Sequence, residues 1–495
     1  MRSMVDGPPG MVRYESVQGD YHQRRTLRKT AGWILLWALG VGAVISGDFG
    51  GWNYGLAAGG FGGLALATIL MSAMYVCLVF SIAELSAALP HAGGFFSFTR
   101  NALGPLGGFV CGLTDAIEYI LTPAVIVYFI GGYMSKLFPA VDAAWWWIAC
   151  YGLFVGINIV GVSLTLRLGL AITLVAVGVL ICFYVSAITS GQFEWSKLFL
   201  DAEGAKTGWL PRGWTGVLLA LPSAMWFYLA IEQLPLAAEE SHDAVRDLPR
   251  ALILGIVTLL VLSILTLVLN SGVGAGAGAM GKSSAPLGDG FEAMWGVGTA
   301  SRLLVALALT GLIASFHTTI YAYGRVLFAL SRAGYIPRWV SMTSSYHTPA
   351  AALVVGAVIG LACTFAIRSF GETSQVGVGL LNMAVFGAVL SYILVLVSYI
   401  RLRITRPDLP RPYRSPLGIP GAVVGTILAG LALLATFGVP EFRPAMYGVA
   451  GVTGVGILYF LGYSRYHLVA SAPEEENAIL ERAEREIEHD PPISK

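Results

Sequence analysis

Apolar stretches long enough to cross a lipid bilayer recur along nearly the whole sequence, and they constrain the fold more than any other feature. A spanning helix needs about 20 mostly apolar residues to cross the ~30 Å hydrocarbon layer. Of the 495 residues, 56% are hydrophobic and only 12% are charged, which is too much apolar surface for one water-soluble core. The sequence therefore predicts an all-α polytopic membrane protein with about twelve transmembrane helices. We expect them at residues 31–52, 60–88, 105–137, 144–163, 167–189, 214–238, 250–272, 299–331, 350–367, 376–400, 420–438 and 445–463.

Lysine and arginine are distributed unevenly between the predicted loops. An even number of spans places both chain ends on one side of the membrane, and most basic residues fall on that side. Two clusters illustrate the bias: Arg24, Arg25, Arg28 and Lys29 before the first span, and Arg401, Arg403, Arg406, Arg411 and Arg414 after the tenth. Because cytoplasmic loops carry the excess of positive charge, both termini are predicted to be cytoplasmic. The polar first thirty residues show no cleavable signal peptide, and a net charge of +1 argues against a nucleic-acid partner.

Two predicted spans, the first and the sixth, contain helix-breaking residues near their middle. The first is rich in glycine between Gly40 and Gly51, and the sixth carries Pro222 and Pro235. Irregular backbone at membrane depth is tolerated only inside protein or beside a water-filled cavity. Two discontinuous helices five spans apart are typical of an inverted-repeat transporter, and they predict a binding site near the bilayer midplane.

Three segments resemble signatures of the amino acid-polyamine-organocation (APC) permeases. Residues 81–95 resemble the motif of their second helix, residues 239–251 the loop after the sixth, and residues 332–337 the end of the eighth. The resemblance extends over residues 30–465. It implies a leucine-transporter-type fold, in which two inverted five-helix repeats are followed by two extra helices, and a location in a bacterial inner membrane.

Within that superfamily, the sequence looks most like the bacterial ethanolamine permease group, on residues 46–49, 117–123 and 230–240. The expected division of the chain follows from the family fold. It comprises a cytoplasmic N-terminal tail (1–30), a first repeat (31–189), an extracytoplasmic loop (190–213), a second repeat (214–400), two additional helices (401–465) and an acidic cytoplasmic tail (466–495). We interpret the tail as solvated, because charge runs of this kind usually are.

The first span departs from the amino acid permease pattern, which usually has Gly-Ser-Gly followed by an aliphatic residue. Here Ile45 stands at the first glycine and Asp48 at the aliphatic position, and Ala230 replaces a glycine that is usual in the sixth helix. A carboxylate at this place repels a substrate carboxylate and attracts an ammonium group. We therefore predict that Asp48, Ser46 and Gly47 bind a substrate cation. The alternative is a structural carboxylate that is hydrogen-bonded to the unwound backbone or salt-bridged elsewhere.

Three further acidic residues inside predicted spans, Asp115, Glu118 and Glu232, need an explanation, because a charge there costs about 2.5–3.5 kcal/mol on insertion scales and usually marks a functional site. Glu118 lies in the pocket-facing part of the third helix by resemblance, and it is a candidate for substrate or proton binding. Asp115, three residues earlier, shares its helix face, and a wetted structural role is its more ordinary explanation. Glu232 resembles a glutamate after the sixth-helix break of relatives, which implies a role in proton or conformational coupling.

The remaining candidates are aromatic and polar residues of the sixth and eighth spans. Trp226 and Tyr228 offer aromatic faces to an ammonium, and Trp226 resembles a gating tryptophan of related exchangers. Ala230 and Thr319 correspond to pocket positions of relatives. His317 is a coupling candidate because imidazole titrates near neutral pH, although a buried histidine is more often a hydrogen-bonded core residue.

These observations predict a secondary active transporter that imports ethanolamine by alternating access, with proton symport as the preferred coupling. An amino acid permease or exchanger of the same fold is the alternative. The partners expected are a small amine substrate and membrane lipid. The five cysteines lie singly in apolar segments, and no metal cluster, cofactor motif or nucleophile–base pair indicates an enzyme.

Overall fold

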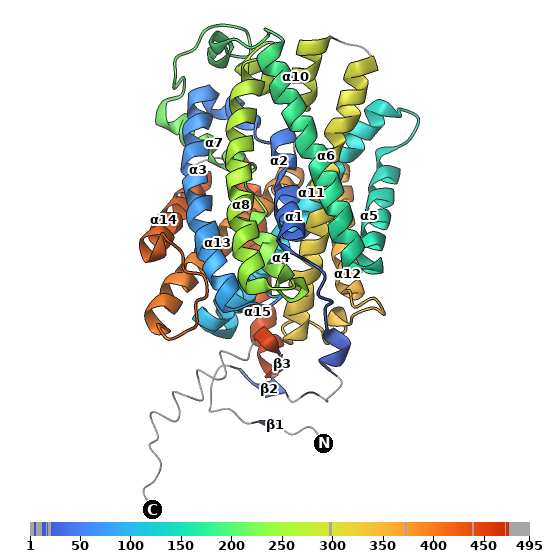
Figure 1. Ribbon diagram of the computed structural model, residues 1–495, viewed down its shortest axis with the longest axis vertical. Coiled ribbons are helices and arrows are strands. Elements are labelled where there is room, and N and C mark those ends of the chain that lie inside the picture. The colour runs from blue at the N-terminus through green and yellow to red at the C-terminus, as the bar shows by residue number, and fades with distance from the viewer. Residues whose placement is uncertain are drawn as a thin grey trace, which may run out of the picture.

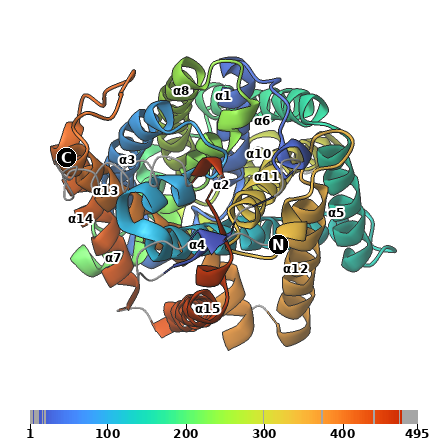
Figure 2. The same cartoon turned by 90° about the horizontal axis from the view of Figure 1, so that it is seen from below.

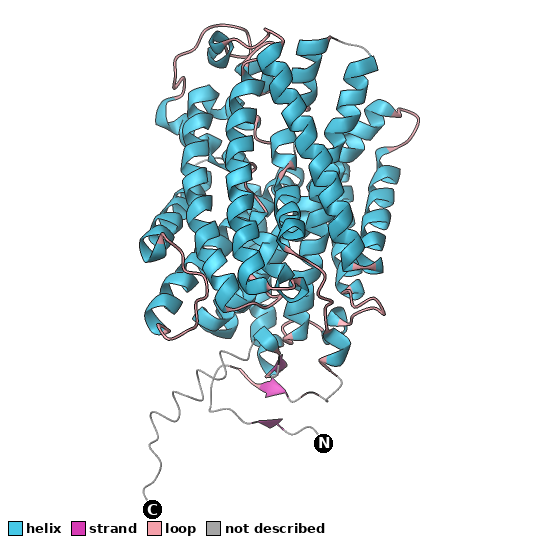
Figure 3. Ribbon diagram, in the orientation of Figure 1, coloured by secondary structure: helices cyan, strands magenta, loops and turns pink. Residues whose placement is uncertain are grey.

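The computed structural model describes residues 4–5, 12–15, 17, 21–296, 299–371, 374–437, 440–470 and 472–474. They form a bundle made almost entirely of helices, with three two-residue strands beneath it (Figures 1 and 3). We call the end of the bundle next to these strands the sheet side, and the other end the opposite side. The sheet orders its strands β1–β2–β3, with β2 and β3 parallel.

The elements follow one another along the chain in a simple order. They are β1 (Met4–Val5), β2 (Tyr14–Glu15), η1 (Gln23–Arg25), α1 (Trp33–Val44), α2 (Ser46–Phe49), α3 (Tyr54–Ala88), α4 (Phe95–Leu137), α5 (Ala143–Val160), α6 (Val162–Thr189), η2 (Trp195–Phe199), α7 (Gly213–Met225), η3 (Ile231–Glu240), α8 (Ala244–Leu265), η4 (Thr266–Asn270), α9 (Ala277–Met280), α10 (Pro286–Trp295), α11 (Thr299–Arg332), η5 (Arg338–Ser341), α12 (Ala350–Phe370), α13 (Gln375–Thr405), α14 (Gly418–Phe437), η6 (Pro440–Phe442), α15 (Arg443–Gly462), η7 (Ser464–Tyr466) and β3 (Leu468–Val469).

The predicted all-α membrane architecture is confirmed. Within the described residues, nine helices are long and apolar enough to cross a membrane, and the shorter apolar helices include the interrupted first and sixth segments. Each predicted span coincides with a helix or an interrupted helix. The predicted starts at residues 60 and 105 instead mark kinks, since α3 bends at Gly60 and α4 at Gly104, where φ is +69° and +82°.

The helices differ in how much surface they expose. The most apolar window of α4 is 89% buried, whereas the corresponding windows of α5, α12, α14 and α15 are one-third buried or less. Seen from below, these four helices lie on the outside of the bundle (Figure 2). Exposed Ile, Leu and Val side chains on such helices contact lipid tails instead of water, so a hydrophobic outer surface is stable here.

The first and sixth segments are both interrupted, as predicted. In the first, α1 ends at Val44 and the four-residue helix α2 ends before Gly50. In the sixth, α7 ends at Met225, and Ala230 adopts the left-handed conformation, with φ +83°, before η3 begins. The sixth segment therefore breaks five residues before Pro235, which lies inside η3. The two breaks leave main-chain groups facing one another in the bundle interior.

Ion pairs hold the sheet side closed. Arg325 and Glu240 form a pair with both side chains completely buried, at 2.7 Å between Nη2 and Oε1. Glu84, near the end of α3, accepts hydrogen bonds from Arg403 and from the main-chain N–H of Ser415. On the opposite side, Asn53 donates hydrogen bonds of 3.0 and 2.9 Å to the carbonyls of Met280 and Ser283, which joins the first segment to the loops around α9 and α10.

Candidate functional site

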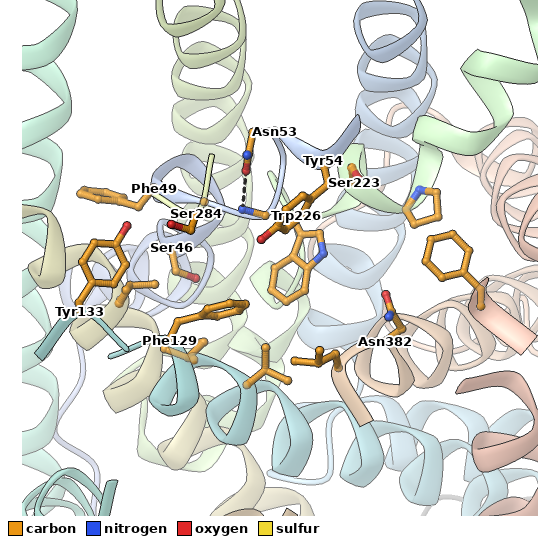
Figure 4. Close-up of a pocket in the computed structure, with 18 residues that line it drawn as sticks. Ser46, Phe49, Asn53, Tyr54, Phe129, Tyr133, Ser223, Trp226, Ser284 and Asn382 are labelled. Carbon is orange, nitrogen blue, oxygen red and sulfur yellow. Dashed lines mark hydrogen bonds between the residues drawn. The ribbon is translucent and has the colours of Figure 1, made fainter. Parts of the chain in front are cut away.

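A cavity of about 310 Å³ lies beside the break in the first segment (Figure 4). Its lining residues come from the opposite-side half of the bundle, including the start of α3, the end of α4 and the start of α13. They are Ser46, Phe49, Gly50, Gly51, Asn53, Tyr54, Val125, Ile126, Phe129, Tyr133, Pro222, Ser223, Trp226, Ser284, Leu312, Leu381, Asn382 and Phe442. The lining combines aromatic faces with hydroxyl and amide groups, and among the described residues it includes no ionisable acid or base other than tyrosine, so it suits a small, partly apolar solute.

Trp226 lies in the middle of this cavity, between Ser46 and Phe129 on one side and Asn382 on the other (Figure 4). Its ring also packs against the main chain after α2, since a Cβ added at Gly51 would lie 3.4 Å from Trp226 Cδ2. Two of the predicted binding residues, Ser46 and Trp226, therefore share one cavity. Trp226 thus lies between the first segment and α13 within this cavity.

Gly47 permits the two interrupted segments to touch. A Cβ added at Gly47 would lie only 1.9 Å from the carbonyl oxygen of Trp226. Only glycine accommodates so close an approach between two main chains. Gly47 thus determines the spacing of the two breaks, although it does not line the cavity itself.

Ser315 of α11 holds the break of the first segment together. Its hydroxyl accepts a hydrogen bond from the main-chain N–H of Ser46 (3.1 Å) and donates one to the carbonyl of Gly42 (3.0 Å). Main-chain groups released by a helix break need such partners within a membrane. Ser315 was not predicted from the sequence, because a single serine in an apolar helix carries no signal of its own.

Asp48 is buried, and its carboxylate is directed away from the cavity lining. Its Oδ1 accepts a hydrogen bond of 2.8 Å from Thr266 in η4, a π-helical turn, and the Thr266 hydroxyl lies 2.7 Å from that of Tyr184. The other oxygen, Oδ2, has no hydrogen-bond partner among the described residues. Asp48 itself does not line the cavity, but its helix neighbours Ser46 and Phe49 do.

Glu118 and Glu232 lie together in a second polar cluster, within the bundle core. Their carboxyl groups are close enough to interact electrostatically, and Glu232 Oε2 has no hydrogen-bond partner among the described residues. Glu232 Oε1 accepts hydrogen bonds from the Ala230 main-chain N–H (3.0 Å) and from the Tyr392 hydroxyl. The Glu118 carboxyl group has no hydrogen-bond partner among the described residues, and Asp115 is buried one turn before it. Neither glutamate lines the cavity.

The remaining predicted residues lie outside the cavity lining. The Tyr228 hydroxyl contacts those of Ser72 and Ser263, both at 2.7 Å. Thr319 donates to the carbonyl of Ser315 at 2.7 Å. His317 contacts the carbonyl of Thr165 through Nε2 at 2.9 Å and packs against α5 and α6. Each of these three side chains is therefore held by hydrogen-bond partners within the protein.

Several cavity residues were missed by the sequence reasoning. Phe129, Tyr133 and Asn382 lie on α4 and α13, which carry no break or charge at these positions. Asn382 is the only one with a detectable signal, since an amide in an apolar span is uncommon. Within the described residues, no group of three or more His, Cys, Asp and Glu side chains is arranged to hold a metal ion.

Ala230 provides a test of the sixth-segment break. A left-handed conformation costs a non-glycine residue about 1–2 kcal/mol, and Ala230 adopts it with φ +83°. We expect Ala230→Gly to keep or raise the thermal unfolding midpoint of the purified protein. Ala230→Val should lower the free energy of unfolding by about 1–3 kcal/mol, and the unfolding midpoint with it, because a β-branched side chain adds strain at a buried site. Equal midpoints for the valine variant and the parent protein would contradict this conformation.

The family model that describes amino acid permeases matches residues 32–461. An uncharacterized transporter of Rhizobium meliloti is 28% identical over 422 residues, which cover 84% of this chain and 88% of the relative. The branched-chain amino acid permease BcaP of Bacillus subtilis is 24% identical, with 90% of this chain and 94% of BcaP covered. A probable GABA permease of Pseudomonas aeruginosa is 24% identical, with coverage of 83% and 87%. The chain is a multi-pass membrane transporter, not an enzyme, and it belongs to the amino acid permease family of the APC superfamily.

Proposed function

We propose that this permease imports ethanolamine, as the protonated amine, across a bacterial inner membrane by alternating access, with both termini in the cytoplasm. The observation that carries the proposal is the position of Asp48. It belongs to the same four-residue helix as the cavity residues Ser46 and Phe49, and Oδ2 has no counter-charge or hydrogen-bond donor among the described residues. A negative charge so close to a cavity with low-dielectric walls favours a cation and opposes a carboxylate.

The lining of the cavity suits a small amine alcohol. The indole face of Trp226 can hold an ammonium by a cation–π contact, which is worth about 2 kcal/mol when both groups are desolvated. Hydroxyl and amide groups of Ser46, Ser223 and Asn382 offer partners for the substrate hydroxyl. In this proposal the negative charge of Asp48 attracts the substrate cation, and Trp226 contacts the ammonium and closes the cavity. Gly47 allows the two interrupted segments to pack closely.

Glu118 and Glu232 are the proposed site of the coupling proton. Two buried carboxylates so near each other repel when both are ionised, which favours one proton on the pair. Glu232 lies two residues after Ala230, and it accepts a hydrogen bond from the Ala230 main-chain N–H at the sixth-segment break. Loss of that proton would place two negative charges against each other in the bundle core and would favour their separation. Protonation is thereby linked to the geometry of the break.

An amino acid substrate is the second candidate. BcaP is a branched-chain amino acid permease and another relative is a probable GABA permease. The main chain at Gly50 and Gly51 lines the cavity, where their N–H groups donate to the Ser46 carbonyl and to Asn53 Oδ1, and a substrate carboxylate would have to replace these acceptors. Competition experiments separate the two candidates because only one of them requires a carboxylate.

The test is uptake of radiolabelled ethanolamine into proteoliposomes that hold the purified protein, with and without an inward proton gradient. We expect the gradient to accelerate uptake, and a large excess of alanine, leucine or GABA to leave it unchanged. Competition by an amino acid, or uptake of labelled amino acid without ethanolamine uptake, would favour the second candidate. An uptake rate that is the same with and without the gradient would exclude proton coupling.

Asp48→Asn tests the charge that the proposal depends on. The change keeps the size of the side chain and its acceptor for Thr266 but removes the negative charge. We expect ethanolamine uptake at subsaturating concentration to fall about 10-fold or more, which corresponds to ~1.4 kcal/mol of lost cation stabilisation. Asp142→Asn is the matched control on the opposite side. The hydrogen bond with Arg368 lowers the pKa of Asp142 to about 2, so Asp142→Asn removes a negative charge from a residue that does not line the cavity. Unchanged uptake by Asp48→Asn would rule out this role.

A further inference from the structure

The C-terminal segment inserts a carboxylate into the sheet side of the bundle. Glu474 is completely buried, and its Oε1 lies 2.5 Å from Nη2 and 3.2 Å from Nε of Arg332, the last residue of α11. The same guanidinium holds Glu239, through a hydrogen bond of 2.8 Å from Nη1 and a second from Nη2. One buried arginine therefore joins α11, the end of η3 and the C-terminal segment.

Several main-chain contacts hold this segment in place. After α15, the hydroxyl of Ser464 donates to the carbonyl of Tyr335, and the N–H of Val469 donates to that of Ala333. Strand β3 pairs in parallel with β2 of the N-terminal segment. Close packing continues to Glu474, whose Cγ would lie 3.1 Å from a Cβ added at Gly93, between α3 and α4. The segment is therefore part of the folded sheet side up to Glu474. Residues 475–495 lie outside the described part of the acidic tail that we expected to be solvated.

The position of this contact gives it a consequence for transport. Glu239 is the penultimate residue of η3, the sheet-side half of the interrupted sixth segment, and it also accepts a hydrogen bond from the N–H of Ala92 in the turn between α3 and α4. The cavity lies at the other end of the same elements, towards the opposite side. Alternating access requires the sheet side to open. Arg332 binds Glu239 of η3 and Glu474 of the C-terminal segment, and Glu239 in turn binds the α3–α4 turn. The sheet side cannot open while all of these contacts are present at once.

We propose that Glu474 is a latch that closes the sheet side of the substrate pathway, and that it leaves Arg332 once in every transport cycle. The proposal rests on alternating access, as in the proposed function, but not on the identity of the substrate. The sharing of one guanidinium between two carboxylates suits a releasable contact. When Glu474 leaves, Glu239 still pairs with Arg332, so no charge is left alone in the interior.

Hydrogen–deuterium exchange tests the latch without any substrate. In Glu474→Gln, the Arg332–Glu239 pair remains, so the protein should stay folded. We expect the main-chain amides around residues 91–95 and 236–241 to exchange several-fold faster than in the parent protein, and those lining the cavity to exchange more slowly. Glu194→Gln is the control, because Glu194 forms an exposed ion pair with Lys197 in the loop between α6 and η2. Exchange that is unchanged in Glu474→Gln would overturn the proposal.

A reversible crosslink provides the second test. In a background without the five native cysteines, Gly93→Cys and Glu474→Cys would place two thiols at a separation that a disulfide can bridge. We expect oxidation to form the crosslink and to stop ethanolamine uptake, and a reductant to restore it. Failure to form the crosslink would contradict the contact, and undiminished uptake by the crosslinked protein would contradict the latch. If no ethanolamine is transported even after reduction, the proposed substrate is wrong, and the exchange experiment alone decides on the latch.

Discussion

Replacing Gly47 by alanine should abolish transport and destabilise the protein. The added Cβ would lie 1.9 Å from the carbonyl oxygen of Trp226, 2.7 Å from its carbonyl carbon and 3.3 Å from the nitrogen of Phe227. All three are main-chain atoms, so no side-chain rotation can relieve the clash, and the two interrupted segments must move apart. Overpacking of an interior costs about 1–3 kcal/mol even where side chains can adjust. The measurements are the initial rate of uptake and the thermal unfolding midpoint.

Gly430→Ala is the matched control for this experiment. Gly430 lies in α14, and a Cβ added there has no heavy atom within 4 Å. Alanine is a better helix former than glycine by about 0.5–1 kcal/mol, so stability should stay the same or rise slightly. A Gly47→Ala protein that transports as fast as Gly430→Ala would show that the two main chains do not approach as closely as described.

Removing Arg325 alone should have the largest effect on stability. Arg325 and Glu240 are both completely buried, and the Tyr321 hydroxyl also donates to Glu240. In Arg325→Met, the Glu240 carboxylate would remain buried without its counter-charge. Breaking a buried ion pair in this way costs about 3–5 kcal/mol. The unfolding midpoint of the purified protein should fall accordingly, and the yield of folded protein with it.

A double variant distinguishes two contributions to the loss of stability: the loss of the ion pair itself and the burial of an unpaired charge. Replacing both partners by apolar residues of similar size often costs little, so Arg325→Met with Glu240→Leu should be more stable than Arg325→Met alone. Lys282→Ala removes one member of an exposed pair with Glu203 and should change stability by less than about 1 kcal/mol. A double variant that is less stable than both single ones would show that the pair contributes in a way that burial does not explain.

The membrane architecture and the two breaks were predictable from sequence for a physical reason. Lipid cannot satisfy main-chain groups, so apolar runs of this length must be helices, and glycine or proline clusters inside them must lie against protein or a cavity. The breaks at Ile45 and at Ala230 fall inside the first and sixth predicted spans. Ser46 and Trp226 line one cavity for the same reason, since each lies at a break.

Side-chain directions were less predictable. Asp48 was predicted to bind the substrate cation; its Oδ1 bonds Thr266 and the residue does not line the cavity, so contact with the substrate stays a prediction. The orientation of a four-residue helix such as α2 depends on its tertiary packing, which no sequence periodicity encodes. Glu474 looked like one more residue of a solvated acidic run. Its burial depends on Arg332, which lies 142 residues earlier, and no local pattern encodes such a partner.

The parallel pairing of β2 with β3 also affects how the protein is made. Tyr14 and Leu468 are neighbours in this sheet, so β2, near the start of the chain, cannot pair with β3 until residue 468 has left the ribosome. The helices can insert into the membrane one after another during synthesis, but the cytoplasmic face that we propose for the sheet cannot be completed until translation ends. A nascent permease stalled before residue 468 would hold its helices in the bilayer with that face unfinished, accessible to chaperones and proteases.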